Sequence, residues 1–212
     1  MHLLLLGFWE VILTKPLKEY VQQVLAEHGR GDKIRRAFEF ANFTVNALAA
    51  SPTWRRKGTR RAIFWELAVE KLIELTQDDP GLFVDEHHDT ISFIFDDAIL
   101  VRLKKADMGL HSSNYPTPLA QLFHEHEADL FGFTGLQRIE AVYIPNQFET
   151  DIIWSGIIAR DGHIPLWHFE LVAPAVAPVL PLPMPAQPTA EDLAKLKNQA
   201  KDADRKKGGD GA

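Results

Sequence analysis

Cysteine is absent from this sequence of 212 residues. Its absence excludes disulfide bonds, zinc sites with thiolate ligands and thiol nucleophiles. Long apolar runs are scarce too: the run within residues 1–13 is about half of the roughly 20 residues that a membrane-spanning helix needs. Glu10 interrupts this run and no basic residue precedes it, so it is typical of neither a signal peptide nor an anchor. We expect a core strand or helix start here, with an interfacial segment or an upstream start codon as alternatives.

Recognisable catalytic motifs are missing as well. The sequence offers no nucleophile–base set, no phosphate-binding loop and no set of four metal ligands, so we expect no metal, no cofactor and no identifiable reaction. The net charge of -6 and the pI near 5.8 argue against attraction of the whole surface to nucleic acid or anionic lipid. A local basic patch stays open. With 46% hydrophobic residues the chain can bury a core, and cytoplasm is the expected location.

The spacing of apolar residues predicts helices first and strands afterwards. A helical period covers residues 16–28, 32–49 and 59–76. The period changes to two from Leu82, and a hairpin turning at Asp96-Asp97 is followed by a helix at about 118–130 and by strands at 138–144, 150–159 and 164–172. The fold class is therefore α+β, with N-terminal helices and a mostly antiparallel sheet of about five strands that contains one inserted helix.

Three regions follow from this reading. Residues 1–52 form an N-terminal helical region and residues 53–172 an α+β core. Residues 173–212 are expected to be disordered, because the segment 173–190 holds six prolines and the charged end has little apolar surface. Within the core, we expect Trp167 and Phe169 of the last strand to bury against Phe93 and Val101.

One strand and the loop after it form the most distinctive segment. In residues 99–105, Leu100, Arg102 and Lys104 face away from the side of Val101, and the loop SSNYPT follows at 112–117. If the next helix covers this face, Arg102 needs a carboxylate or carbonyl partner. A structural salt bridge is one interpretation; the other is a recess for a binding partner, formed by Arg102, Lys104, Asn114 and Tyr115.

A basic group lies at the start of the third helix. Five cations fall within seven residues beside an aromatic side chain, Trp54, in an arrangement suited to phosphate binding: Arg55, Arg56, Lys57, Arg60 and Arg61. Cations at a helix N-terminus oppose the macrodipole, which suggests a use for them. The alternative is a solvated charge run.

Two further groups of residues lack the spacing that a metallopeptidase or a restriction-type nuclease requires. His124 and His126 are two residues apart and point to different sides of a helix, whereas a metallopeptidase helix spaces its histidines by four. The acidic run before Arg102 lacks the carboxylate that a restriction-type nuclease places two residues before its lysine, because Arg102 stands two before Lys104.

Residues 60–172 resemble a family of small bacterial proteins encoded beside a protein that joins a helix-turn-helix domain to an ImmA/IrrE-type zinc metallopeptidase. Such pairs are toxin–antitoxin modules linked to phage defence. The resemblance rests on Arg102, Lys104, Asn114, Pro116, Thr117, Trp167 and Glu170, while Glu140-Ala141-Val142-Tyr143 stands where the family has a Gly-Tyr pair. It implies that this chain is the toxin, neutralised by its helix-turn-helix/ImmA–IrrE-type antitoxin. The alternatives are a non-enzymatic nucleic-acid or protein adaptor that uses the Arg55–Arg61 group and, more remotely, a metal-dependent hydrolase.

Overall fold

The computed structural model describes residues 15–48, 56–87, 90–112, 118–126 and 135–173. The chain divides into two compact units, Met1–Pro174 and Ala175–Ala212, and all described residues belong to the first. The predictions for the N-terminal run, for Arg55, Asn114 and Tyr115 and for the proline-rich tail lie outside the described residues. No described helix is long and apolar enough to cross a membrane.

Three helices open the described part of the chain, as predicted: α1 (Lys18–Ala26), α2 (Arg30–Ala47) and α3 (Lys57–Thr76). The boundary between the first two differs from the prediction, because α2 begins at Arg30 and not at Asp32. A short 3-10 turn, Glu27–Gly29, joins them, and its His28 and Gly29 have φ angles of 50° and 64°. Glycine adopts this left-handed conformation without steric cost, so the chain changes direction within three residues.

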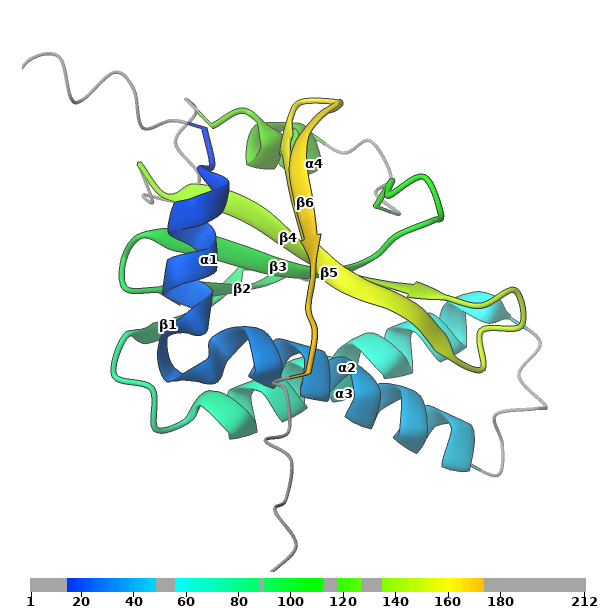
Figure 1. Cartoon of the computed structure of the whole chain (residues 1–212). Helices are drawn as coiled ribbons and strands as arrows, with labels where there is room; N and C mark the ends of the chain where they lie inside the picture. The colour runs from blue at the N-terminus through cyan, green and yellow to red at the C-terminus, as the bar shows by residue number, and fades with distance from the viewer. Residues whose placement is uncertain (1–14, 49–55, 88–89, 113–117, 127–134, 174–212) are drawn as a thin grey trace, which may run out of the picture. The chain divides into compact units, whose positions relative to one another are not determined.

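Six strands form one sheet in the order β1-β2-β3-β4-β5-β6, so the α+β class is confirmed with one strand more than expected (Figure 1). The strands are β1 (Leu82–His87), β2 (Thr90–Phe95), β3 (Ile99–Lys105), β4 (Gln137–Pro145), β5 (Ile152–Asp161) and β6 (Ile164–Glu170). Asp96 and Asp97 form the predicted hairpin turn, with φ angles of 54° and 48° that match the two-residue turn favoured between twisted strands.

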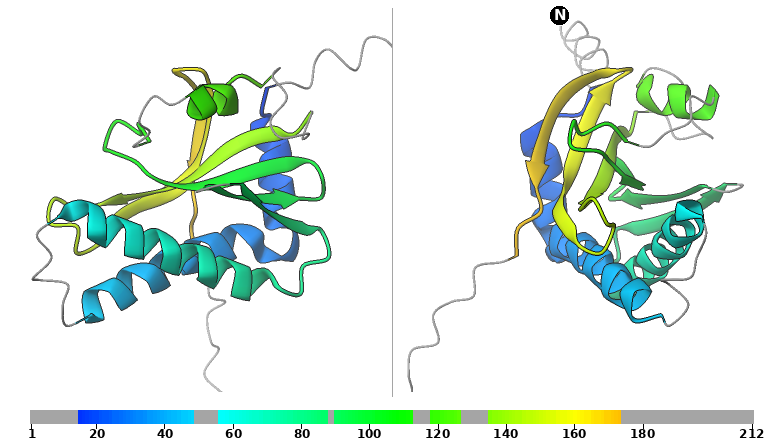
Figure 2. Two further views of the ribbon diagram at one scale, coloured as in Figure 1. Left: turned by 180° about the vertical axis from the view of Figure 1, so that it is seen from behind. Right: turned by 90° about the vertical axis from the view of Figure 1, so that its right-hand side faces the viewer.

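The pair β3 and β4 is parallel, and every other neighbouring pair is antiparallel. Parallel strands need a crossover connection, and here the short helix α4 (Pro118–His124) lies in it. Figure 2 shows α4 on one face of the sheet, with α2 and α3 on the opposite face. Helix α4 therefore lies over the face that carries Arg102.

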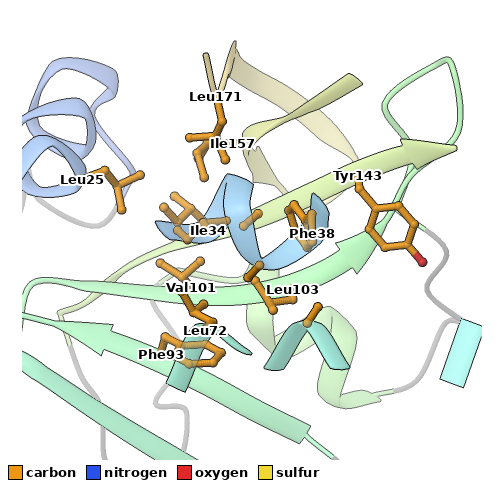
Figure 3. Packing of buried hydrophobic residues seen from close by; sticks show 14 of the residues in the cluster. Leu25, Ile34, Phe38, Leu72, Phe93, Val101, Leu103, Tyr143, Ile157 and Leu171 are labelled. Carbon is orange, nitrogen blue, oxygen red and sulfur yellow. The ribbon is translucent and has the colours of Figure 1, made fainter. Parts of the chain in front are cut away.

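The hydrophobic core lies between the sheet and α1–α3 (Figure 3). Helix side chains such as Phe38 and Leu72 meet strand side chains such as Phe93 and Val101, and these four are at most 1% exposed. The alternation predicted for β3 is confirmed, because Val101 belongs to this cluster and Leu100 to a smaller one with Phe123 of α4.

Trp167 and Phe169 point to the core side, as expected, but they are only half-buried. The reason is their position on β6, an edge strand of the described sheet that β4 and β5 separate from Val101 on β3. The indole N–H of Trp167 donates to the Pro16 carbonyl at 2.7 Å, which ties the edge to the segment before α1.

Candidate functional site

A layer of buried charged residues lies between α4 and the sheet face opposite the core. Strand register sets Arg102 of β3 beside Glu140 of β4, and Glu140 beside Ile158 of β5. Arg102 and Glu140 are 4% and 1% exposed, and Arg138 and Arg160 are also buried. We call Arg102, Lys104, Arg138, Glu140 and Arg160 the charged layer. Its formation follows from alternation, since each residue takes the same side of its strand.

Arg102 lies within this layer and not at the surface. Its guanidinium lies 4.4 Å from the ring centre of Phe123 on α4, and its Nε donates to Ser92 Oγ at 3.1 Å. Among the described residues its Nη2 has no hydrogen-bond partner. Burial, opposed by the attraction of Glu140, lowers the pKa of Arg102 to about 10, which leaves it charged at neutral pH. The helix after the loop covers Arg102, which is the condition under which a carboxylate or carbonyl partner is expected. The hydrogen-bond partner is instead the Ser92 hydroxyl.

Lys104 lies two residues after Arg102 on β3, on the same side of the strand, and its side chain is half-buried. Burial lowers the pKa of its ammonium group, Glu140 raises it and Arg102 lowers it further. The other two predicted recess residues, Asn114 and Tyr115, fall outside the described part. The structure therefore brings two of the four together, with Lys104 the more accessible.

Glu140 and Arg138 organise the layer, and sequence reasoning missed both roles. Glu140 Oε1 lies 3.6 Å from His124 Nε2, and its Oε2 lies 3.7 Å from Arg160 Nε. Arg138 Nη1 donates to the carbonyls of Leu122 and Glu125, at 2.7 and 3.0 Å. A cation that donates to the last carbonyls of a helix stabilises that end, so Arg138 fixes α4 to the sheet.

His124, the last residue of α4, and His126, two residues beyond the helix, have separate environments. His124 faces Glu140, whereas His126 Nε2 lies 2.5 Å from the Arg160 carbonyl. Burial lowers the pKa of His126, which favours its neutral form, and the carbonyl contact requires the proton on Nε2. Within the described ranges no three His, Asp or Glu side chains are grouped to hold a metal ion.

A pocket of about 600 Å³ opens beside the charged layer. One wall is α4, with Gln121, His124 and Glu125; the others are the β5–β6 turn and the segment after β3. The Gly162 amide donates to the His124 carbonyl at 3.2 Å, so the turn and the helix are held together. Arg160 forms part of the lining, and its guanidinium also donates to the Leu110 carbonyl.

The basic group at the start of α3 is partly used within the molecule. Arg60 Nε donates to the Glu149 carbonyl at 2.9 Å, and Arg61 Nη2 lies 2.9 Å from Glu149 Oε1. Lys105 Nζ reaches the same carboxylate oxygen at 2.5 Å. Burial raises the pKa of Glu149, but hydrogen bonds from Lys105 and Arg61 lower it by more. Arg56 is exposed, and nothing is described of Arg55 or the Lys57 side chain. These contacts favour a structural role for Arg60 and Arg61.

Another buried cation, Arg30, lies apart from the charged layer and was also missed from the sequence. Its side chain is fully buried; Nε and Nη2 donate to the two oxygens of Asp79 at 2.7 and 2.9 Å. Nη2 and Nη1 also donate to Asp96 in the hairpin turn, and Nη1 to the Val24 carbonyl. The partners lie 49 and 66 residues away, so no local pattern announces the cluster. It joins α2, the segment before β1 and the β2–β3 turn.

Comparisons with known proteins add no relative. No protein-family model matches the chain, and no curated protein or solved structure is significantly similar to it.

Proposed function

We propose that this chain is the toxin-side component of a bacterial two-gene toxin–antitoxin module, active in the cytoplasm. Its action is binding of a cellular target, and its cognate helix-turn-helix/ImmA–IrrE-type antitoxin neutralises it by covering the binding surface. The support is the resemblance of residues 60–172, together with one observation about where the resembling segments meet.

That observation is the convergence of these segments on the charged layer and its pocket. Strand β3 contributes Lys104 and also Arg102, which the helix after the SSNYPT loop covers. Strand β4 sets Glu140 beside Arg102, at a position where the chain departs from the family. Of the described residues that carry the resemblance, Arg102 and Lys104 belong to the charged layer, whereas Trp167 and Glu170 lie on the edge strand β6. Since Arg102 is buried, its role in the proposal is to hold the layer, while exposed neighbours meet the partner.

The surface to be covered is the outer side of α4 and the mouth of the pocket. Gln121, Glu125 and His163 are exposed there, and Leu122 is 38% exposed. Donors and acceptors around an apolar side chain are the usual composition of a transient protein interface.

Growth of a bacterium that expresses the chain tests the proposal. Expression alone is expected to arrest growth, and co-expression of the neighbouring helix-turn-helix/ImmA–IrrE-type protein is expected to restore it. Arg102→Met and Asn114→Ala should weaken toxicity or antitoxin binding while the circular-dichroism spectrum stays that of a folded protein. Arg56→Met, which changes an exposed arginine on the helix boundary far from α4 in sequence, is the matched control and should leave both unchanged.

Two results together would contradict the toxin proposal. One is harmless expression at high level of a protein whose circular-dichroism spectrum is folded. The other is a genome without such a neighbour. The adaptor alternative would then be the better account, tested below through the basic group.

A further inference from the structure

The pocket beside α4 gathers imidazoles from three separate segments. His111 comes from the segment after β3, His124 from α4 and His163 from the β5–β6 turn. His111 and His163 are exposed at the mouth, whereas His124 and Arg160 are 9% and 7% exposed at the floor. A single pocket thus offers one guanidinium and three imidazoles as donors, with Ser112 and Gln121 beside them.

Positive charge exceeds negative charge behind this floor. Asp79 and Glu140 are the buried carboxylates among the described residues, and Asp79 binds Arg30 elsewhere. Glu140 is thus the buried carboxylate that faces Arg102, Lys104 and Arg160. Nearby acids reduce the excess in part: Asp85 attracts Arg102, Glu125 is exposed at the rim, and Asp161 pairs with Lys15 at 2.5 Å.

Two buried arginine nitrogens without hydrogen bonds also indicate an excess of positive charge. Arg160 lines the pocket, and its buried Nε forms no hydrogen bond within the described residues, although it lies 3.7 Å from Glu140 Oε2. Arg102 is not part of the lining, and its buried Nη2 also lacks a hydrogen bond within the described residues. The lowered pKa of Arg102 and of Lys104, caused by burial, is consistent with cations held away from water. A surplus of poorly solvated cations beside a half-enclosed pocket produces a field that attracts anions.

We infer that this pocket binds the phosphate group of a small molecule. A phosphate monoester brings close to two negative charges and three strong acceptor oxygens, which matches the surplus charge and the donors at the floor and mouth. A volume of about 600 Å³ lies in the range of ordinary small-molecule sites and has room for a nucleoside monophosphate. The inference does not depend on the toxin proposal, since it concerns the purified chain alone.

Titration of the purified full chain tests it, with inorganic phosphate and AMP as probes and adenosine and sodium chloride at equal ionic strength as controls. Phosphate and AMP are expected to raise Tm in a saturable manner and to shift the amide NMR signals of Ser112, Gly162 and His163. Adenosine and sodium chloride should do neither. The ionic-strength control matters because screening alone changes the stability of a charged protein.

Variants identify the site. His163→Ala and His111→Ala change exposed side chains, so the fold should survive, and the pair together should weaken AMP binding at least tenfold. Arg160→Gln should weaken it more. The matched control is His168→Ala, an exposed histidine on β6 outside the pocket lining, which should leave affinity unchanged.

Three results would overturn the inference. They are the absence of a saturable response to both probes, equal binding of AMP and adenosine, and an affinity unchanged in the His111/His163 double variant. Acetate and citrate should bind more weakly than phosphate; tighter binding of a carboxylate would also contradict the assignment of a phosphate ligand. Growth arrest without phosphate binding would leave the toxin proposal standing and end this one.

Discussion

The two faces of the sheet are built on different principles. Towards α1–α3 the strands present apolar side chains such as Phe93 and Val101, which pack on Phe38 and Leu72. Towards α4 the same strands present buried arginines around Glu140. Burial of apolar surface stabilises in proportion to area, whereas burial of charge costs desolvation that its partners only partly recover. The first face therefore accounts for stability, and the second is the better candidate for function.

The largest contrast between the faces is expected from two substitutions of buried side chains. Phe38→Ala removes a ring that is 1% exposed and contacts Phe64 and Tyr143, so it should cost about 3–5 kcal/mol of unfolding free energy. Arg102→Met replaces a buried cation by an apolar chain of similar length and should change stability by less than about 1.5 kcal/mol. It removes a desolvated guanidinium whose Nη2 has no hydrogen-bond partner among the described residues, and Glu140 keeps Arg160 at 3.7 Å, so no buried carboxylate is left without a cation. Urea denaturation measures both. Equal losses in the two variants would show that the charged layer is as necessary to folding as the core.

The buried ion pair of Arg30 and Asp79 allows the same test of buried charge outside the charged layer. Arg30→Ala leaves the buried carboxylate of Asp79 without its cation and should cost about 3–5 kcal/mol. Arg35→Ala is the control on the same helix: its pairs with Asp32 and Glu39 are local, so about 1 kcal/mol or less should be lost. A loss from Arg30→Ala no greater than the control's would contradict a stabilising role for the cluster.

Acid titration sharpens this prediction. Hydrogen bonds from Arg30 lower the pKa of Asp79 and of Asp96, with burial opposing. A carboxyl whose pKa is lower in the folded state contributes stability above its unfolded pKa, and loses it as pH falls through the folded pKa. The unfolding free energy should therefore drop below about pH 4. The drop should be smaller in Arg30→Ala, which lacks the hydrogen bonds that lower the two pKa values. If the unfolding free energies of the two proteins fell in parallel with pH, Arg30 would not be the cause of the lowered pKa values.

Substitutions in the basic group at the start of α3 should have a smaller effect on the unfolding free energy. Arg61→Ala breaks a partly exposed pair with Glu149 and should cost less than about 1 kcal/mol. Replacement of Arg55, Arg56, Arg60 and Arg61 by alanine tests the adaptor alternative through retention of nucleic acid at low salt. If the group binds phosphates, retention should fall in the variant, and that of the unchanged protein should fall steeply as salt rises. Unchanged retention would dispose of the adaptor.

The smallest effect is expected from removing the tail. Prolines from 174 to 188 prevent regular packing, so a chain ending at Val172 should keep its melting temperature. The measurement is thermal denaturation of the full and shortened chains. A loss of several degrees would show that the tail packs on the rest of the protein.

The sequence predicted the apolar face of the sheet better than the charged face under α4. Periods of 3.6 and two located the helices and strands, and they assigned Val101 and Arg102 to opposite sides of β3. The count of strands and the exposure of Trp167 were less exact, because a strand's place in the sheet depends on pairing order. The roles of Arg30, Arg138 and Glu140 had no signal in the sequence, since their partners are distant or are backbone carbonyls.

The sequence by itself determined the α+β class, the hairpin turn at Asp96-Asp97 and the two-sided pattern of β3, because these depend on residues close in the chain. Only the tertiary structure decided which cations share Glu140 and that His111, His124 and His163 line one pocket. The parallel crossover through α4 brings them together. Such contacts are set by the three-dimensional path of the chain, and periodicity carries no information about that path.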